Sequence, residues 1–390
     1  MEQFEEVISR KGTRSVKWDM AEELYQDKDV LPMWVADMDF KIPEAVTNAL
    51  KERIEHGIFG YTMPDQLVKN EIKNWLEKRH QWDIDSEWIS YSPGVIPSLH
   101  MIVQSLTDIG DHILIQTPVY PPFYSVVKDH GRHIVKNPLR LNGERYEIDF
   151  DDFEKKIKEN HVTVFILCNP HNPVGRVWTK DELERMANIC LKHGVKIVAD
   201  EIHADLIYSN QKHMPIASLS DQANQHTITC LSPTKTFNLA GLQASYLVIA
   251  NKEDKAKVDK QFKNQGMMML NTLGLTALET SYKYGESWLE ELNKVLENHR
   301  DYVMERFHEE TSSIRVIPAE GTYLLWLDCR KLNMEQKELK SFMQKQAKVG
   351  LNDGTTFGEE GKGFMRLNIA APKSILEEGV SRIINAVQSL

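Results

Sequence analysis

"TVFILCNPHNPVGRVWTKDELERMANICLKHGVKIVADE", residues 163–201, contains the pattern that decides the fold. Its two ends, "TVFILCNP" (163–170) and "GVKIVADE" (194–201), are short runs of apolar and β-branched residues with no polar alternation. Such runs predict strands that are buried on both faces, as in a parallel sheet. The two runs lie roughly thirty residues apart, which is the length of a strand–helix–strand unit.

The segment between these strands, 179–193, predicts the helix of that unit. Thr179 and Glu182 have the spacing of a capping box, which satisfies free backbone N–H groups at a helix start. Gly194 suits the left-handed turn that ends a helix. Apolar residues at helical spacing form one face of the helix, and they are Leu183, Met186, Ala187, Cys190 and Leu191.

Two further apolar runs extend the pattern on both sides. They are "DHILIQTP" (111–118) and "HTITCLSP" (226–233). The sequence therefore predicts an α/β fold in which helices cover a mostly parallel sheet. We assign this large domain to residues 48–284.

A different pattern begins after residue 284. "GESWLEELNKVLENHRDYVMERFHEE" (285–310) predicts one long amphipathic helix, whose apolar side carries Leu289, Leu292, Leu296, Val303 and Phe307. Two strands and two helices are expected after it: strands at 322–329 and 363–370, and helices near 335–348 and 374–388. This mixture predicts a smaller α+β domain, made of residues 1–47 and 285–390.

The composition is typical of a soluble globular protein. The 390 residues are 41% hydrophobic and carry a formal net charge of −10, which argues against nucleic acid as a partner. No apolar run approaches the length that spans a membrane, and the first residues lack the apolar core of a signal peptide. The cysteines, Cys168, Cys190, Cys230 and Cys329, form no C-x-x-C pair. We therefore expect a cytoplasmic protein without disulfides or structural zinc.

Polar and aromatic side chains follow the ends of the predicted strands. In an open α/β sheet, these ends form the edge at which ligands bind. Each side chain alone has an ordinary explanation: a helix cap for an aspartate, a turn for an asparagine, packing for a tyrosine, and solvent exposure for a lysine. Their convergence on one edge favours a binding site instead. The side chains are Tyr120, Asn172, Asp200, His203, Ser232 and Lys235.

A lysine amine, a carboxylate, an amide and an aromatic ring together match the chemistry of pyridoxal phosphate. The lysine bonds the cofactor aldehyde, and the carboxylate keeps the ring nitrogen protonated. The phosphate needs a group of N–H donors. "SPGVIPSLHMIVQSL" (92–106) supplies such a group, because Gly94 comes immediately before a predicted helix start.

Four motifs resemble the fold-type I pyridoxal-phosphate enzymes, the aspartate aminotransferase superfamily. They are "NPHNPVG" (169–175), "DEIH" (200–203), "SPTKTFNLAG" (232–241) and "FMRLNIAAP" (364–372), and the resemblance covers nearly the whole chain. Within that superfamily, "GTRSVKWD" (12–19) and "LPMWVADMDF" (31–40) resemble the MalY/PatB-type cystathionine β-lyases, also called C–S lyases. The resemblance implies the fold-type I architecture, with a large cofactor-binding domain and a smaller domain.

The resemblance also implies roles for single residues around the cofactor. Lys235 corresponds to the lysine that bonds the aldehyde, Asp200 to the partner of the pyridine nitrogen, and Tyr120 to the aromatic residue stacked on the ring. These three are the expected catalytic residues. Asn172 corresponds to the amide that binds the ring hydroxyl. The expected phosphate ligands are Ser232 and the backbone of Gly94, Val95 and Ile96.

Further residues are assigned to the substrate and to a second subunit. Arg366, in "FMRLN", corresponds to the arginine that binds the substrate α-carboxylate. Ala36 lies in "LPMWVADMDF", which we expect to line the substrate side of the pocket. Tyr61, in "IFGYTMP" (58–64), corresponds to a tyrosine that reaches the phosphate of the neighbouring subunit. The resemblance therefore implies a homodimer with shared sites.

The sequence departs from the superfamily pattern at two positions. His203 stands where many relatives have a tyrosine that contacts the ring hydroxyl. Gln243 stands where many have a phosphate-binding arginine, so the phosphate loses one positive charge among its ligands. Both changes are compatible with the lyase branch.

The implied reaction is a β-elimination on an amino acid. Lys235 removes the Cα proton and a thiol leaves, so that L-cystathionine gives homocysteine, pyruvate and ammonia.

The first alternative is an aminotransferase, which the same catalytic residues would serve. The second is a metal-dependent hydrolase using Asp200, Glu201 and His203, which lacks an H-E-x-x-H motif or a third ligand at suitable spacing; we expect no metal site. The third is a binding or regulatory protein without turnover, against which the intact lysine, aspartate and arginine argue.

Overall fold

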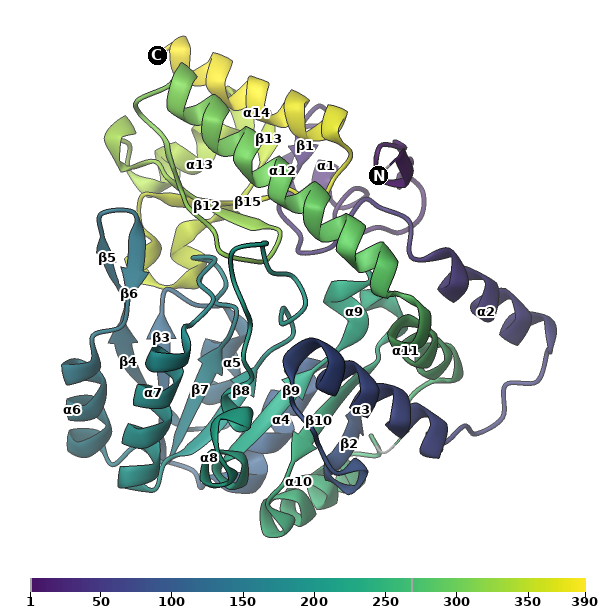
Figure 1. Ribbon diagram of the computed structural model, residues 1–390. Coiled ribbons are helices and arrows are strands. Elements are labelled where there is room, and N and C mark those ends of the chain that lie inside the picture. Colours follow the sequence, from purple (N-terminus) through teal and green to yellow (C-terminus); the bar gives the residue numbers. More distant parts are fainter. Residues whose placement is uncertain (1, 268) are drawn as a thin grey trace.

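The computed structural model describes residues 2–267 and 269–390, and its largest sheet has seven strands (Figure 1). Four of these strands were predicted from apolar runs, and all four are confirmed. In spatial order the strands are β2 (Ile89–Ser92), β10 (Ser245–Ile249), β9 (Thr227–Leu231), β8 (Lys196–Asp200), β7 (Val164–Cys168), β3 (His112–Thr117) and β4 (His133–Pro138).

The sheet is mostly parallel, as predicted. Strands β9, β8, β7, β3 and β4 run parallel to one another, whereas β10 is antiparallel to both β2 and β9. Asp200, the last residue of β8, lies opposite Cys168 on one side and Cys230 on the other. Cys168 is the last residue of β7, and Cys230 is the last but one of β9. Three consecutive strands therefore end side by side, which brings the residues that follow them to one edge.

Helices cover both faces of this sheet. Side chains alternate along a strand, so Ile166 of β7 packs with one set of helices while Phe165 and Leu167 pack with the other. The first set comprises α4 (Val95–Leu106), α5 (Pro122–Lys128) and α10 (Lys252–Asn264), and the second comprises α6 (Phe150–Asn160) and α7 (Lys180–His193). Burial on both faces explains why these strands are continuous apolar runs.

Helix α7 has the ends that its sequence predicts. The Thr179 hydroxyl accepts a hydrogen bond from the Glu182 N–H, and the Glu182 carboxylate accepts one from the Thr179 N–H. Gly194 ends the helix in the left-handed conformation, at φ +68°. The remaining helices of this part of the chain are α2 (Glu44–Glu55), α3 (Gln66–His80), α8 (Asp221–His226), α9 (Pro233–Thr236) and α11 (Thr272–Tyr284).

A second, antiparallel sheet lies in the C-terminal third of the chain. Its strands, in spatial order, are β11 (Arg315–Ile317), β12 (Leu324–Asp328), β15 (Phe364–Asn368) and β14 (Asn352–Asp353). The long predicted helix is α12 (Glu286–Glu310), which Figure 1 shows in green beside α14 (Lys373–Gln388) in yellow. Helix α13 (Gln336–Lys345) is shorter than predicted because the chain then forms strand β13 (Val349–Gly350). A small hairpin pairs β5 (Arg140–Asn142) with β6 (Arg145–Glu147).

The N-terminal segment joins the C-terminal third. Strand β1 (Leu31–Pro32) pairs in parallel with β13, and helix α1 (Ala21–Tyr25) precedes it. We call residues 31–40 the strap. All residues of β15 are buried, and Asn368 at its end donates hydrogen bonds to the Val35 and Asp37 carbonyls of the strap. The domain boundaries at residues 48 and 284 stay a prediction.

The four cysteines are buried and free. Among the helices of the described residues, none combines the length and the apolar character needed to cross a bilayer.

Candidate active site

A cavity of about 170 Å³ lies at the carboxyl ends of β7, β8 and β9. It collects most of the residues that the sequence predicts for the site. The lining residues are Ala36, Gly94, Val95, Ile96, Pro97, Tyr120, Cys168, Asn172, Asp200, Ile202, His203 and Lys235.

Lys235 reaches this cavity from α9, the single helical turn that follows β9. Ser232 caps that turn by accepting a hydrogen bond from the Thr234 N–H at 3.1 Å, and Pro233 occupies its first position. The Lys235 Nζ donates to the Ala36 carbonyl of the strap at 2.5 Å. Burial lowers the pKa of Lys235 to about 8, so about a tenth of the amine is uncharged at pH 7 and the fraction rises steeply above it.

Asp200 is the last residue of β8 and is 4% exposed. Burial raises the pKa of its carboxyl to about 7, although the Ile202 N–H donates a hydrogen bond to it at 3.2 Å. Within residues 2–267 and 269–390 no cation forms an ion pair with Asp200 at 4.0 Å or less. A buried carboxylate of this kind is stabilised when a ligand brings a positive charge to it.

Arg366 enters the site from β15 and is also buried. Its Nη1 donates to Asn172 Oδ1 at 3.0 Å, and its Nη2 donates to Asn352 Oδ1 at 2.6 Å and to the Trp34 carbonyl at 3.0 Å. Its Nε has no hydrogen-bond partner, and none of the carboxylates in the described part of the chain pairs with it. Burial lowers the pKa of the guanidinium to about 10, so it remains charged at neutral pH.

Two rings and a helix start complete the cavity. Burial raises the pKa of Tyr120 to about 12, so its phenol keeps its proton. Burial lowers the pKa of His203 to about 3, and the positive charges of Lys235 and Arg366 act in the same direction. His203 is therefore neutral, and its Nδ1 has no hydrogen-bond partner. Helix α4 begins after Gly94 without a side-chain cap, which leaves backbone N–H groups at its start for an anion.

Arg366 reaches the site through Asn172 but is not itself among the lining residues, and three further residues expected near the cofactor also lie outside the lining. Ser232 uses its hydroxyl to cap α9 and to bind the Ala244 carbonyl at 2.6 Å. Gln243 is exposed. The Tyr61 side chain is 96% exposed and lies in the loop between α2 and α3.

Other residues at the site were missed from the sequence. Cys168 and Ile202 line the cavity, and the strand-end rule that found Asp200 could have found both. Tyr323 donates from its hydroxyl to the Ala36 carbonyl at 3.0 Å, and Asn352 holds Arg366. No short motif marks these two residues, because their position depends on how the second sheet packs against the strap.

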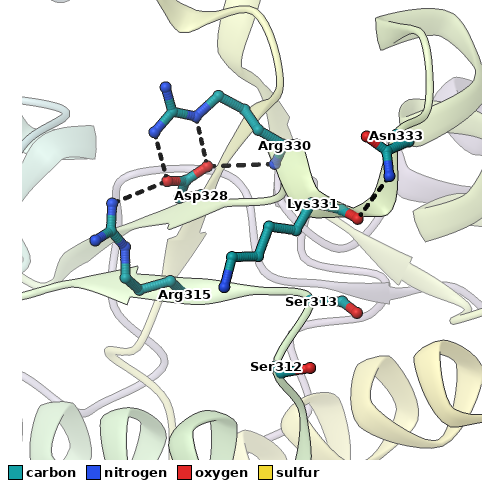
Figure 2. A pocket seen from close by; sticks show the side chains of 7 residues that line it. All are labelled: Ser312, Ser313, Arg315, Asp328, Arg330, Lys331 and Asn333. Atoms are coloured by element: carbon teal, nitrogen blue, oxygen red, sulfur yellow. Dashed lines mark hydrogen bonds and ion pairs between the residues drawn. The ribbon is translucent and has the colours of Figure 1, made fainter.

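A larger hollow of about 650 Å³ lies elsewhere, beside β11 and β12 (Figure 2). Its two arginines, Arg315 and Arg330, both bind Asp328, at 3.1 and 2.7 Å. Figure 2 shows that the Asp328 carboxylate lies between the two guanidinium groups. Their charge is thus already partly neutralised, and none of the residues that line the smaller cavity borders this hollow. Of these two hollows, the smaller one holds the buried Lys235 amine and the Asp200 carboxylate.

A comparison with protein families identifies the chain. The family model described as "Aminotransferase class I and II" matches residues 28–383. The chain belongs to this family. The chain is 45% identical in sequence to the cystathionine β-lyase PatB of Bacillus subtilis, and the match covers 97% of this chain and 98% of PatB. It is 33% identical to the protein MalY of Escherichia coli, over 99% of each chain.

A solved structure gives the same result. Cystalysin from Treponema denticola, whose crystal structure contains pyridoxal 5′-phosphate, is 37% identical and superposes with a TM-score of 0.97 over 99% of this chain and 98% of cystalysin. The fold-type I architecture and the MalY/PatB relationship predicted from the sequence are therefore confirmed for this aminotransferase-family chain.

The cavity residues fit pyridoxal phosphate. Lys235 supplies the amine, Asp200 has no cation among the described residues, and the start of α4 offers free N–H groups. His203, whose Nδ1 has no hydrogen-bond partner, lines the same space. Among the residues that the structure describes, no group of three or more histidine, cysteine, aspartate or glutamate side chains is arranged to hold a metal ion.

Proposed function

We propose that this protein is a pyridoxal-phosphate-dependent C–S lyase that cleaves L-cystathionine. The observation that carries the proposal is the buried, unpaired guanidinium of Arg366, which lies in the same site as the Lys235 amine and the Asp200 carboxylate. This set suits an α-amino acid, whose carboxylate would bind Arg366 while its Cα faces Lys235. The relatives PatB and cystalysin support the lyase reaction.

We propose that five side chains hold the cofactor. Lys235 bonds its aldehyde, Asp200 pairs with its ring nitrogen, and Tyr120 stacks on its ring. Asn172 would bind the ring hydroxyl, and His203 would contact the ring from the same cavity lining. The start of α4 at Gly94, Val95 and Ile96 receives the phosphate. When bound, the cofactor accepts the electron pair that remains after Cα loses its proton.

Lys235 has the properties of the base that takes the Cα proton. Burial brings its pKa to about 8, close to neutral pH, where a general base works best. Its Nζ is held by the Ala36 carbonyl, which fixes the direction of the amine. Arg366 is held by Asn172, Asn352 and the Trp34 carbonyl, so a carboxylate bound to it is oriented relative to Lys235.

The proposed reaction releases three products. The Cα–H bond breaks and the proton passes to Lys235 Nζ; the Cβ–S bond then breaks and the sulfur leaves with a proton as homocysteine. Water hydrolyses the remaining three-carbon unit to pyruvate and ammonia. No second amino acid or keto acid is consumed.

A product assay with purified protein and L-cystathionine tests the proposal. We expect many turnovers of free thiol, matched one to one by pyruvate, without added keto acid. Lys235→Ala protein, prepared in the same way, should release neither product. Amine transfer that stops after a single turnover, resumes with 2-oxoglutarate and releases no thiol would make the protein an aminotransferase instead.

We also propose that the protein acts as a cytoplasmic homodimer in which Tyr61 reaches the partner's site. Exposed apolar side chains are concentrated from the end of α2 to the start of α3, and Figure 1 shows this part of the chain at the edge of the molecule. They are Ile54, Ile58, Phe59, Tyr61, Met63 and Leu67, each more than half exposed. A second copy would cover them. The four free cysteines suit a reducing compartment.

Hybrid dimers test this arrangement. Tyr61→Ala and Lys235→Ala chains are each expected to have low activity alone. When the two are refolded or co-expressed together, one of the two sites in each hybrid carries neither change, so activity should return. If hybrids stay inactive while both parents dimerise, Tyr61 does not act across the interface.

A further inference from the structure

A cluster of charges lies between the N-terminal segment and the strap. Arg10 binds Asp37 through two hydrogen bonds, of 3.0 and 2.7 Å, and binds Asp39 at 2.8 Å. Lys17, whose side chain is 1% exposed, binds Asp39 at 2.7 Å and lies 3.9 Å from Asp37. Two cations and two carboxylates thus neutralise one another in a largely buried place.

The motif "GTRSVKWD" (12–19) supplies much of this cluster. Trp18 Nε1 donates to Asp39 Oδ1 at 2.8 Å, and Trp34 Nε1 of the strap donates to the Lys17 carbonyl at 3.3 Å. Burial acts to raise the pKa of Asp39, but Lys17 and the other donors hold it below its ordinary value. Asp39 is therefore ionised and fixed by several donors at once.

The same strap contacts the reactive side chains. Its Ala36 carbonyl accepts hydrogen bonds from Lys235 Nζ and from the Tyr323 hydroxyl, and its Trp34 carbonyl accepts one from Arg366 Nη2. The Val35 and Asp37 carbonyls accept from Asn368 Nδ2, at 2.6 and 2.7 Å. The ion cluster thus fixes, through side chains, a segment whose backbone positions the base and the carboxylate-binding arginine.

We propose that Arg10 and Lys17 are positioning residues of the active site. By binding Asp37 and Asp39, they hold the strap against Lys235 and Arg366, and they prevent the charge of Asp37 from acting in full on the Lys235 amine. The proposal rests on the proposed function only for the reaction that Lys235 and Arg366 carry out. The contacts that hold the strap do not depend on that reaction. It gives the motif "GTRSVKWD" a part in catalysis without contact to substrate.

The charges around Lys235 determine how its amine responds. Asp37 faces it from the strap and Asp200 from β8, and both stabilise the protonated amine; Arg366 faces it from β15 and opposes them. His203 and Tyr323 also face the site and are uncharged at neutral pH. Removal of Arg10 leaves Asp37 with one cation fewer, so the Asp37 carboxylate attracts the positive charge at the Lys235 nitrogen more strongly. The Lys235 nitrogen should therefore keep its proton to a higher pH.

Hydrogen–deuterium exchange tests the structural part of the proposal. In the full-length protein loaded with pyridoxal phosphate, Arg10→Gln should exchange the amides of peptide 31–40 about tenfold faster, which corresponds to about 1.4 kcal/mol. The reporters are the N–H groups of Met33, Met38 and Asp39, which bind Gly350, Asn238 and Ala370. Peptides from β7 and β8 should exchange at the wild-type rate.

A pH titration tests the electrostatic part. The visible absorbance of the cofactor bound at Lys235 reports protonation of the linking nitrogen. Its midpoint should move up by about one pH unit in Arg10→Gln. In Arg10→Gln/Asp37→Asn, from which both charges are absent, the midpoint should return to the wild-type value or fall below it. A residue that served only stability would not move this midpoint.

Lys41→Gln is the matched control, because Lys41 forms an exposed ion pair with Glu6 in the same part of the chain. It should change neither measurement.

Wild-type exchange of peptide 31–40, or an unmoved midpoint, in folded Arg10→Gln would overturn the proposal. If Arg10→Gln does not fold, Arg10→Lys keeps the charge but loses the two-pronged contact. In Arg10→Lys, peptide 31–40 should exchange faster than in the wild type, whereas the midpoint of the pH titration should not move. Exchange at the wild-type rate in Arg10→Lys would also overturn the proposal. Absence of thiol release by the wild-type protein would overturn the proposed function and leave both measurements valid.

Discussion

Arg366 carries a full positive charge in a place where the described residues offer it only neutral partners. An asparagine side chain lies on each side of its guanidinium, and its planar face rests 4.9 Å from the centre of the Phe357 ring. Such partners orient the group without neutralising it. A substrate carboxylate would therefore gain a charge-assisted, two-pronged contact that forms only when the substrate is bound.

We expect Arg366→Lys to raise the KM for L-cystathionine at least about tenfold, the equivalent of about 1.4 kcal/mol. Lysine keeps the charge but cannot contact both asparagines and a carboxylate with one planar group. Steady-state kinetics with the thiol assay measure the change. The control is Arg330→Lys, in the hollow beside β11, which should leave KM unchanged; an equal effect of both variants would contradict the role of Arg366.

At the scale of elements, one glycine controls how the loop after β7 meets the second sheet. Gly175, the last residue of "NPHNPVG", has φ +74°, and its carbonyl accepts a hydrogen bond from the Glu320 N–H at 2.7 Å. A Cβ on Gly175 would lie 2.7 Å from the Cβ of Ala319. The position therefore excludes a side chain both by its conformation and by its neighbour.

Gly175→Ala should lower the free energy of unfolding by about 2–4 kcal/mol, because a left-handed conformation and a steric clash add together. Gly194→Ala is the matched control. Gly194 has φ +68° but open space around the position of a Cβ, so only the conformational cost of about 1 kcal/mol should appear. Urea unfolding of both variants gives the two values, and equal losses would show that the contact with Ala319 is unimportant.

The elements that could be predicted are those whose sequence pattern is local. The strands β3, β7, β8 and β9, and helix α7 with its caps, follow from apolar runs and capping residues, and the strand-end rule brought Asn172, Asp200 and Lys235 to one cavity. The strap was recognised by resemblance alone. Its contacts join residues near 10–40 to residues near 350–370, and pairing over that distance leaves no periodic signal in either segment.

At the scale of the whole molecule, buried titratable groups connect stability to pH. Burial lowers the pKa of His171 to about 4 and that of His203 to about 3. Below pH 6.5 these two histidines bind protons in the unfolded chain but not in the folded protein. The free energy of unfolding therefore decreases as the pH falls. Asp200 acts in the opposite direction, because its raised pKa lets the folded, cofactor-free protein bind a proton between about pH 7 and 4.

We expect Asp200 to reduce by about 2 kcal/mol the unfolding free energy that the cofactor-free protein loses between pH 7 and pH 5. His171 and His203 each contribute a loss of about 2 kcal/mol, against which Asp200 acts. Asp200→Asn removes this offset, so its loss should exceed that of the unchanged protein by about 2 kcal/mol. Urea unfolding at one fixed protein concentration measures both, and parallel pH curves for the two proteins would contradict the assignment of the Asp200 pKa.

The pairing of β1 with β13 also has a consequence for synthesis on the ribosome. Residues 31–40 leave the ribosome early, but their partners at residues 349–350, 366 and 368 are made more than three hundred residues later. At about 5–20 residues per second, the strap waits roughly 15–70 seconds for the strands that hold it. A nascent chain can form β7, β8 and β9 during that time, yet it cannot close the wall of the catalytic cavity. The enzyme therefore gains its reactivity only at the end of translation.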